Sequence, residues 1–292
     1  MSLLQAIFMG IIQGLTEFLP VSSSGHLAIF KILFGVDTDT GMLFDVLLHL
    51  GTLAAICVVY YKDIWKLILD GFGILCDALI NVAIFINNKK NREHEPYRRI
   101  VNSSYRKFVM LVIVSTIPTG VIGVIGGDAV EMASEILIVP GICLIATAIL
   151  LFIADRTKDG DKLPKNISYT NAFGIGIAQG IATLPGLSRS GTTITACLLS
   201  GFNRNFAVKY SFIMSIPAIL GAVVLELKDF GNMALSGKEI PYYLVGMVIA
   251  GLVGYVCIKT MLIVVRKKKF TGFAIYCLII GAISIGGYFY MA

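Results

Sequence analysis

The sequence predicts an all-α polytopic membrane protein, built as an inverted-topology repeat with about six full spans and two re-entrant helical hairpins. Three observations support this fold class. The chain of 292 residues is 57% hydrophobic and only 14% charged, which leaves too little polar surface for a soluble protein of this size. Several of its apolar segments are long enough to cross a bilayer. One pattern of residues occurs twice in the chain.

The repeated pattern appears when the chain is shifted by 166 positions against itself, which places Gln5–His26 on Asn171–Thr192 without a gap. Eight of the aligned positions are identical. Each copy has two short apolar stretches separated by a Pro/Gly/Ser break. Neither stretch reaches the ~20 residues of a straight span, and a break at membrane depth must be buried in protein or line a wet cavity. We therefore predict two re-entrant hairpins, at about 1–34 and 170–202.

Six full spans are predicted after the hairpins, each from a long apolar run. They cover about 44–61, 108–126, 136–154, 207–226, 243–265 and 270–291. The repeat divides a single membrane domain, residues 1–292, into repeat 1 at about 1–154 and repeat 2 at about 170–292. One hairpin and three spans in each half would invert the second copy relative to the first, so that the hairpins enter from opposite faces and meet near the midplane.

The Lys and Arg residues of the short loops set the expected orientation. Segment 87–107 has seven of them and segment 266–269 has four, so both are expected in the cytoplasm. The predicted loop 128–135 has three acids and no base, and is expected outside.

The stretch Trp65–Asn87 is long enough to span a membrane, but it contains Asp70 and Asp77. An aspartate is costly at the centre of a bilayer. We therefore expect this stretch to lie along the interface, within a cytoplasmic loop at 62–107, although a span remains the alternative.

Ionisable side chains lie in both predicted breaks. The first break reads "EFLPVSSSGHL" and the second "TLPGLSRSGTT". Glu17, His26 and Arg189 are each costly inside an apolar layer unless paired or hydrated, and such residues are functional by default. A buried ion pair between Glu17 and Arg189 that pins the hairpins together is the structural alternative, but it leaves the serines and His26 unexplained.

These residue types suit the chemistry of a phosphate group. Arg189 offers a planar fork that matches phosphate oxygens, and the hydroxyl residues after the second break would begin a helix, where an anion is favoured. In the first hairpin, Glu17 can remove a proton, Ser22 or Ser23 can attack, and His26 can donate to or steady the leaving group. A phosphate ester or anhydride reached from within a bilayer implies a lipid phosphate.

Two motifs carry a resemblance to a known family. The pattern Q-G-x-T-E-F-L-P-V-S-S-S-G-H at Gln13–His26, with P-G-x-S-R-S-x-x-T at Pro185–Thr193, resembles the undecaprenyl-diphosphate phosphatase family of bacteria, the bacitracin-resistance type. The resemblance covers nearly the whole chain. It implies hydrolysis of undecaprenyl diphosphate to undecaprenyl phosphate and inorganic phosphate, which recycles the lipid carrier for cell-wall synthesis. It also implies a multi-pass protein of the bacterial plasma membrane whose active site opens to the extracytoplasmic side.

Together with the chemistry above, the resemblance implies catalytic roles for Glu17, Ser23, His26 and Arg189. The expected substrate-binding residues are Gln13, Ser22, Ser24, Ser188, Ser190, Thr192 and Thr193. Many family members have Glu where this chain has Gln13, and an amide can neither act as a base nor bring negative charge to a cation. The family is generally activated by Mg²⁺ or Ca²⁺, for which Glu17 and the substrate diphosphate are the expected oxygen ligands.

Two rival functions remain open. Another class of membrane lipid phosphatases has S-G-H and an S-R followed six residues later by a nucleophilic histidine. This chain has Thr195 at that position, so the mechanism would need His49 or His94 instead. The second rival is a lipid-phosphate transporter that uses the inverted repeat without hydrolysis. The expected partners are a polyprenyl diphosphate lipid and membrane lipids, with no nucleic acid, and a homodimer is left open.

Overall fold

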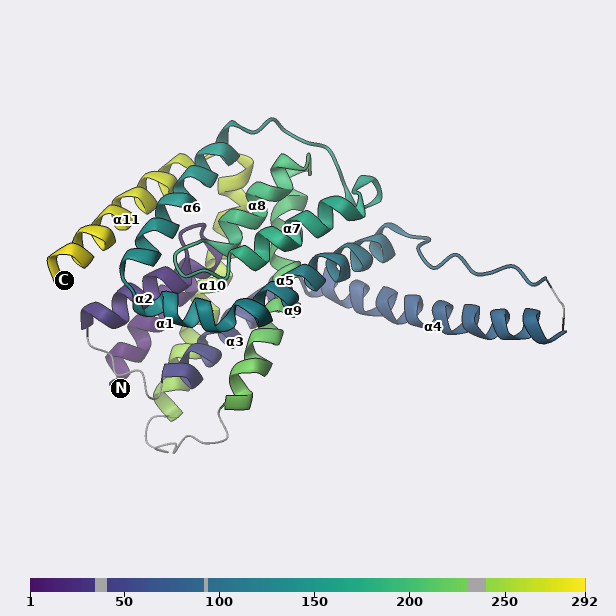
Figure 1. The fold of residues 1–292 in the computed structure, drawn as a ribbon, viewed down its shortest axis with the longest axis horizontal. Coiled ribbons are helices and arrows are strands. Elements are labelled where there is room, and N and C mark those ends of the chain that lie inside the picture. Colours follow the sequence, from purple (N-terminus) through teal and green to yellow (C-terminus); the bar gives the residue numbers. More distant parts are fainter. Residues whose placement is uncertain (35–40, 92–93, 230–239, 292) are drawn as a thin grey trace.

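The computed structural model describes residues 1–34, 41–91, 94–229 and 240–291, and these ranges are helical with short connections (Figure 1). In chain order the helices are α1 (Leu3–Phe18), α2 (Ser23–Phe34), α3 (Gly41–Val59), α4 (Tyr61–Asn91), α5 (Ser104–Glu135), α6 (Ile138–Arg156), the 3₁₀ turn η1 (Pro164–Asn166), α7 (Tyr169–Ile181), α8 (Arg189–Leu199), α9 (Arg204–Asp229), α10 (Ile240–Arg266) and α11 (Thr271–Met291). The prediction of an all-α polytopic membrane protein is confirmed.

Both predicted hairpins are present. The first joins α1, of 16 residues, to α2, of 12 residues, and the second joins α7, of 13 residues, to α8, of 11 residues. Pro20 and Pro185 lie in the breaks between the helices, where a residue without an amide hydrogen and with a fixed φ ends a helix.

The two breaks contact each other in a pairwise pattern. A Cβ atom added to Gly25 would lie 2.7 Å from Gly186 Cα, and one added to Gly191 would lie 3.3 Å from Pro20 Cβ. The shift of 166 positions relates Gly25 to Gly191 and Pro20 to Gly186. Each contact is therefore the image of the other, as expected for two copies that face each other across an approximate two-fold axis.

Each hairpin packs against a long helix of the other half. α1 packs along α10, and α7 packs along α5. Glycines make both approaches close, since a Cβ on Gly10 would lie 2.5 Å from Gly246 O and one on Gly176 would lie 2.1 Å from Ser115 O. α6 and α11 pack on each other as well. Each half therefore packs its hairpin into the other half, and the two polar breaks contact each other between the halves.

Five of the six predicted spans are helices long and apolar enough to cross a membrane: α5, α6, α9, α10 and α11. The remaining one, predicted at 44–61, is the shorter helix α3, whose described apolar part runs from Leu43 to Val59. The predicted loop 128–135 is instead the last part of α5, because the glycines before it do not interrupt the helix.

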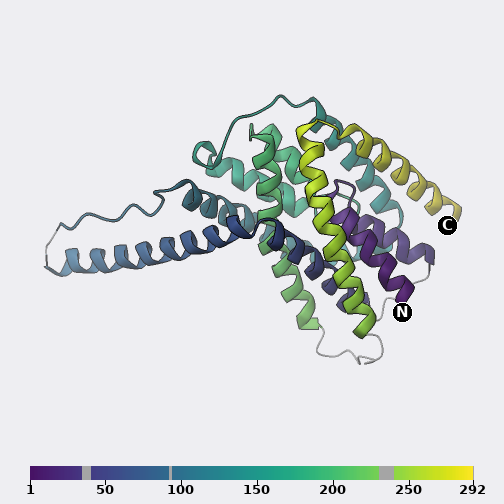
Figure 2. The same cartoon turned by 180° about the vertical axis from the view of Figure 1, so that it is seen from behind.

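The predicted loop 62–107 is mostly helical, because α4 continues to Asn91 and projects from the helical bundle (Figures 1 and 2). Both chain ends lie at the end of the molecule opposite the tip of α4. α4 meets the length and hydropathy of a span. Its aspartates are paired, Asp70 with Arg106 at 3.5 Å and Asp77 with Arg106 at 2.5 Å. Paired aspartates cost less free energy inside a bilayer than the isolated ones assumed from the sequence. The interfacial placement of Trp65–Asn87 stays a prediction.

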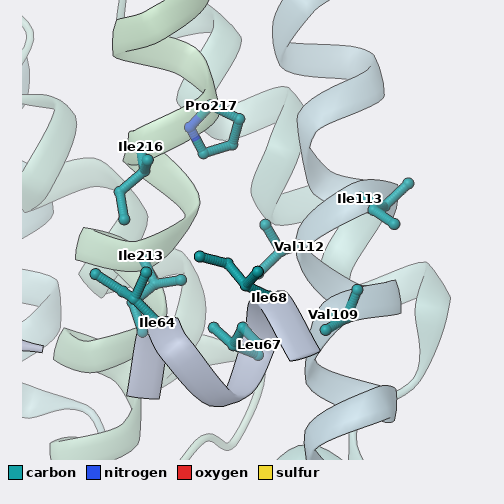
Figure 3. Close-up of a pocket in the computed structure, with 9 residues that line it drawn as sticks. All are labelled: Ile64, Leu67, Ile68, Val109, Val112, Ile113, Ile213, Ile216 and Pro217. Atoms are coloured by element: carbon teal, nitrogen blue, oxygen red, sulfur yellow. The ribbon is translucent and has the colours of Figure 1, made fainter. Parts of the chain in front are cut away.

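An apolar groove lies where the start of α4 meets α5 and α9 (Figure 3). Its volume is about 210 Å³. Its lining residues are Ile64, Leu67, Ile68, Val109, Val112, Ile113, Ile213, Ile216 and Pro217. A lining without ionisable or hydroxyl side chains offers no group for phosphate chemistry. The polar side chains that could act on a phosphate lie instead at the two breaks.

Candidate active site

The first helix brings Gln13 and Glu17 to one buried face. α1 begins at a capping box in which Gln5 N donates to Ser2 Oγ at 3.2 Å and Ser2 N donates to Gln5 Oε1 at 2.8 Å. Residues four positions apart lie on one face of a helix, and in α1 this face is turned into the protein. Both side chains are buried, Gln13 completely.

Glu17 is the centre of a hydrogen-bonded cluster that joins the two hairpins. Its Oε2 accepts from Ser23 Oγ at 2.6 Å and from Gln13 Nε2 at 3.1 Å. Its Oε1 accepts from Nη2 of Arg189, which belongs to the other hairpin. The buried carboxylate is thus paired with a cation and hydrogen-bonded on both oxygens, which is the condition for keeping a charge out of water.

The first break is shaped by Ser22, which has a φ of 71°. A positive φ is uncommon outside glycine and often marks a functional segment. Ser22 Oγ accepts from Gly25 N at 3.2 Å, and this bond caps the start of α2. Ser24 is exposed and contacts Ser22 Oγ at 3.3 Å. This turn presents Ser23 to Glu17, whereas Ser22 and Ser24 form the cap beside it.

His26 is directed away from this cluster. Its Nδ1 lies 2.8 Å from Ser22 O and its Nε2 lies 2.8 Å from the hydroxyl of Tyr276 on α11. The two rings are stacked with centroids 5.6 Å apart. A carbonyl oxygen only accepts, so Nδ1 carries a hydrogen, and a neutral imidazole then accepts at Nε2 from Tyr276. The structure therefore does not bring His26 into contact with Glu17.

The second break holds Arg189 at the first position of α8. Ser188 caps this helix, since its Oγ accepts from Gly191 N at 3.1 Å, and Ser188 Oγ and Ser190 Oγ are 3.3 Å apart. These bonds repeat those of the first break at positions shifted by 166. Nη1 of Arg189 is buried without a hydrogen-bond partner in the described part of the chain, and so is Oγ1 of Thr192.

Three residues that belong to no recognisable sequence motif complete the site: Thr147, Ser211 and Tyr276. Thr193 Oγ1 donates to Arg189 O at 2.8 Å and lies 2.5 Å from Oγ of Ser211 on α9. Thr147 on α6 bonds to both sides of the second break, and Tyr276 bonds to His26. Each belongs to a different helix from the residue it supports. In the sequence, Thr147 and Ser211 are marked only as hydroxyl residues within an apolar helix.

The other two histidines differ in their position: His49 on α3 lies close enough to Glu17 to interact with it electrostatically, whereas His94 lies outside the site. His94 lies on the exposed segment beside the far part of α4. Nδ1 of His49 lies 2.8 Å from Asp45 O on its own helix. Position 195 is a buried threonine that donates to Gly191 O at 2.7 Å. Position 195 therefore holds no nucleophilic histidine, and the mechanism of the histidine-dependent lipid phosphatases would depend on His49.

The cluster offers few ligands for a cation. In the described ranges, no three side chains of His, Cys, Asp or Glu gather in one place. Glu17 supplies one carboxylate, and Oε1 of Gln13 is buried without a hydrogen-bond partner among the described residues. Mg²⁺ is commonly bound through one or two carboxylates together with substrate phosphates and water. The residues present suit a cation that arrives with a diphosphate rather than a site built by protein alone.

The fold and this cluster define a class: a multi-pass membrane protein in which two helical hairpins hold a carboxylate, a hydroxyl and an arginine together in the protein interior. Residues 6–283 match the family model of the bacitracin resistance protein BacA. The chain is 39% identical over 285 residues to an undecaprenyl-diphosphatase of Methanosphaera stadtmanae, covering 98% of both chains. It is 40% identical over 281 residues to one of Treponema denticola, covering 96% of both. The chain belongs to the BacA family.

Proposed function

We propose that this chain hydrolyses undecaprenyl diphosphate to undecaprenyl phosphate and inorganic phosphate. The observation that carries the proposal is the cluster in which Ser23 donates to Glu17 at 2.6 Å while Arg189 engages the other carboxylate oxygen. A base, a hydroxyl and a phosphate-binding fork thus meet at one buried point. Relatives named undecaprenyl-diphosphatase, of nearly the same length, support the same activity.

Binding of the diphosphate would begin at the second hairpin. The free Nη1 of Arg189 and the free hydroxyl of Thr192 are donors without a partner among the described residues, and both lie in the first turn of α8, where the helix dipole favours an anion. Because Arg189 also holds Glu17, a bound phosphate competes with the carboxylate for the guanidinium. Substrate binding would then weaken the ion pair and leave Glu17 a stronger base.

Cleavage needs a nucleophile on the terminal phosphorus, and two routes are compatible with the cluster. In one, Ser23 Oγ attacks while Glu17 takes its proton, the bond to the bridging oxygen breaks, and water later hydrolyses the phosphoserine. In the other, Glu17 and Ser23 orient a water that attacks directly. In both routes Arg189 stabilises the charge that develops on the phosphoryl oxygens. His26 Nε2 reaches the leaving group only after the Tyr276 hydroxyl moves away.

We also propose that the reaction uses a divalent cation, Mg²⁺ or Ca²⁺, with Glu17, the Gln13 amide oxygen and the substrate diphosphate as ligands. Such an ion would neutralise part of the diphosphate charge. The cluster is proposed to open toward the extracytoplasmic side of the plasma membrane. The support is the family resemblance, together with the charge distribution, from which the basic segments 87–107 and 266–269 are expected in the cytoplasm.

The test is release of inorganic phosphate from undecaprenyl diphosphate by the purified protein in detergent, with and without Mg²⁺. Phosphate release that depends on protein concentration, and that the Glu17→Gln variant lacks, is the expected result. A lipid-phosphate transporter without hydrolysis would bind the lipid and release no phosphate. That outcome would replace the proposed function.

A further inference from the structure

The second break is held from outside by a single hydroxyl group on α6. Thr147 Oγ1 accepts a hydrogen bond from Ser188 N at 2.9 Å and donates one to Gly186 O at 3.1 Å. Thr147 is completely buried. One side chain therefore satisfies a backbone donor and a backbone acceptor two residues apart, and no water is needed to do so.

The backbone of this break requires such a partner. Gly186 has a φ of 93°. A Cβ at this position would lie 2.3 Å from Pro140 O, so α6 packs against the turn without room for a side chain. Leu187 N is already bonded to Leu184 O at 3.1 Å. The carbonyl of Gly186 and the amide of Ser188 are both hydrogen-bonded to Thr147, so these two backbone groups of the break are satisfied by one side chain.

The braced residue is adjacent to the phosphate-binding arginine. Ser188 is the N-cap of α8 and Arg189 is the first residue of that helix. A displacement of Ser188 therefore moves the backbone from which the guanidinium extends. None of the hydrogen bonds of Thr147 goes to the guanidinium or to Glu17, so its influence on the site has to pass through the backbone of the break.

The first break has a weaker brace at the equivalent carbonyl. Pro20 corresponds to Gly186 under the shift of 166 positions, and Cys277 Sγ on α11 lies 3.7 Å from Pro20 O. A thiol is a weak donor. The two bracing helices, α6 and α11, touch each other closely, since a Cβ on Gly281 would lie 2.7 Å from Gly141 O. The same helix pair thus braces both breaks, but among the described residues a bracing hydroxyl with two hydrogen bonds is found at the break that carries the arginine and not at the other.

We propose that Thr147 is a positioning residue for the reaction: it fixes the loop before α8 so that Arg189 meets the transferred phosphoryl group in one geometry. The proposal rests on the proposed phosphatase function. The long side chain of Arg189 still reaches a bound diphosphate when the loop loosens, whereas stabilising the transition state requires a fixed donor position. Loss of the hydroxyl should therefore lower kcat more than it raises KM.

The experiment compares Thr147→Val, which keeps the shape and removes the hydroxyl, with Thr147→Ser, which keeps the hydroxyl. Both are measured by phosphate release from undecaprenyl diphosphate with the purified full chain, and Cys277→Ala is the matched control at the other break. Thr147→Val should lower kcat by about 100-fold, the effect of misplacing a catalytic group by about 1 Å. KM should change little, Thr147→Ser should recover most of kcat, and Cys277→Ala should stay close to the unmodified protein.

Unchanged kcat in Thr147→Val would overturn the proposal, as would an equal loss in Thr147→Ser, because the retained hydroxyl would then fail to preserve the geometry of the break. If Thr147→Val does not fold, Thr147→Cys takes its place and must fall well below Thr147→Ser, since it carries the weaker donor. Should the unmodified protein release no phosphate, the proposed function fails and the positioning role fails with it. An active unmodified protein together with unchanged kcat in Thr147→Val overturns the positioning role alone.

Discussion

Arg189 and Glu17, from opposite hairpins, form an ion pair in the protein interior, with the glutamate side chain only 4% exposed and the arginine side chain 20% exposed. An incoming anion therefore meets the guanidinium before the carboxylate. Nη1 of Arg189 is buried and has no hydrogen-bond partner among the described residues. The ion pair joins the hairpins, as a purely structural role would require. Joining the hairpins does not explain why Ser23 and Gln13 also donate hydrogen bonds to Glu17.

Replacing Glu17 with glutamine should abolish phosphate release while the protein still folds. Glutamine keeps an oxygen that accepts from Arg189, and its amide nitrogen can donate to Ser23 Oγ, so the hairpins remain joined, but the amide cannot act as a base. Turnover and the melting temperature of the purified variant are the measurements. Activity within about tenfold of the unmodified protein would show that Glu17 is structural, because losing a general base costs roughly 10²–10⁴-fold.

Replacing Arg189 with lysine should lower kcat by about 100-fold or more, because the charge remains but the fork with its second donor is lost. Arg204→Lys is the matched control. Like Arg189, Arg204 has a buried Nη1 without a hydrogen-bond partner among the described residues, but it holds Asp159 and donates to Thr157 O at 2.7 Å at the start of α9. The control should lose thermal stability and keep its turnover. Equal activity of the two variants would contradict Arg189 as the phosphate clamp.

Replacing Ser23 with alanine distinguishes the two routes of cleavage. If Ser23 is the nucleophile, turnover disappears, lipid binding persists, and rapid acid quench of the unmodified enzyme traps a phosphoserine. If water attacks, no phosphoprotein forms and a residual rate remains, because Arg189 still stabilises the transition state. Ser24→Ala is the control, since Ser24 is exposed and contacts only the hydroxyl of Ser22 among the described residues. An equal effect of both variants would argue that the α2 cap is being disturbed.

The tip of α4 should be cytoplasmic. A cysteine placed at Lys90, which is exposed, should resist an impermeant maleimide on intact cells, in a background where the exposed Cys57 and Cys76 are replaced by serine. Met132→Cys, whose parent residue is 67% exposed near the end of α5, should react from outside. Strong labelling at position 90 would mean that α4 crosses the membrane.

The connection between α6 and the second hairpin should weaken in acid. Hydrogen bonds from Arg204, and then from Lys268 at 2.9 Å, lower the pKa of Asp159 below its usual value. The stabilisation is therefore complete above the unfolded pKa of about 3.8 and is lost as the pH falls through the lower folded pKa. The melting temperature should drop less between about pH 6 and pH 3 for Asp159→Asn than for the unmodified chain. Parallel curves would show that Asp159 does not contribute.

The hairpins and the Glu17–Arg189 meeting could be predicted because they depend on local pattern. The duplicated Gly, Gln and Ser positions mark the same break twice, and an isolated charge in an apolar helix requires a partner. The direction of His26 could not be predicted, because its partner Tyr276 lies 250 positions away on a helix without a motif. Thr147 was missed for the same reason, since a hydroxyl in an apolar helix usually bonds to its own backbone.

The prediction for α4 shows a different limit. Asp70 and Asp77 were treated as isolated charges, but Arg106 and Arg98 return along the helix to pair with them. Such pairs involve residues 21 to 36 positions apart, and no periodicity in the sequence marks them. The charge of a segment can be read from composition, whereas the neutralisation of that charge depends on how the following segment folds back.

The interleaved packing has a consequence for biosynthesis. Gly10 on α1 lies against Gly246 on α10, so the first helix leaves the ribosome long before its partner has been made. At ~5–20 residues per second, that interval is roughly 10–50 s. Throughout it, a short helix carrying Gln13 and Glu17 must stay near the bilayer without the glycine-lined surface that later covers it. We expect the nascent N-terminal segment to be held by the insertion machinery or at the membrane surface until α10 emerges.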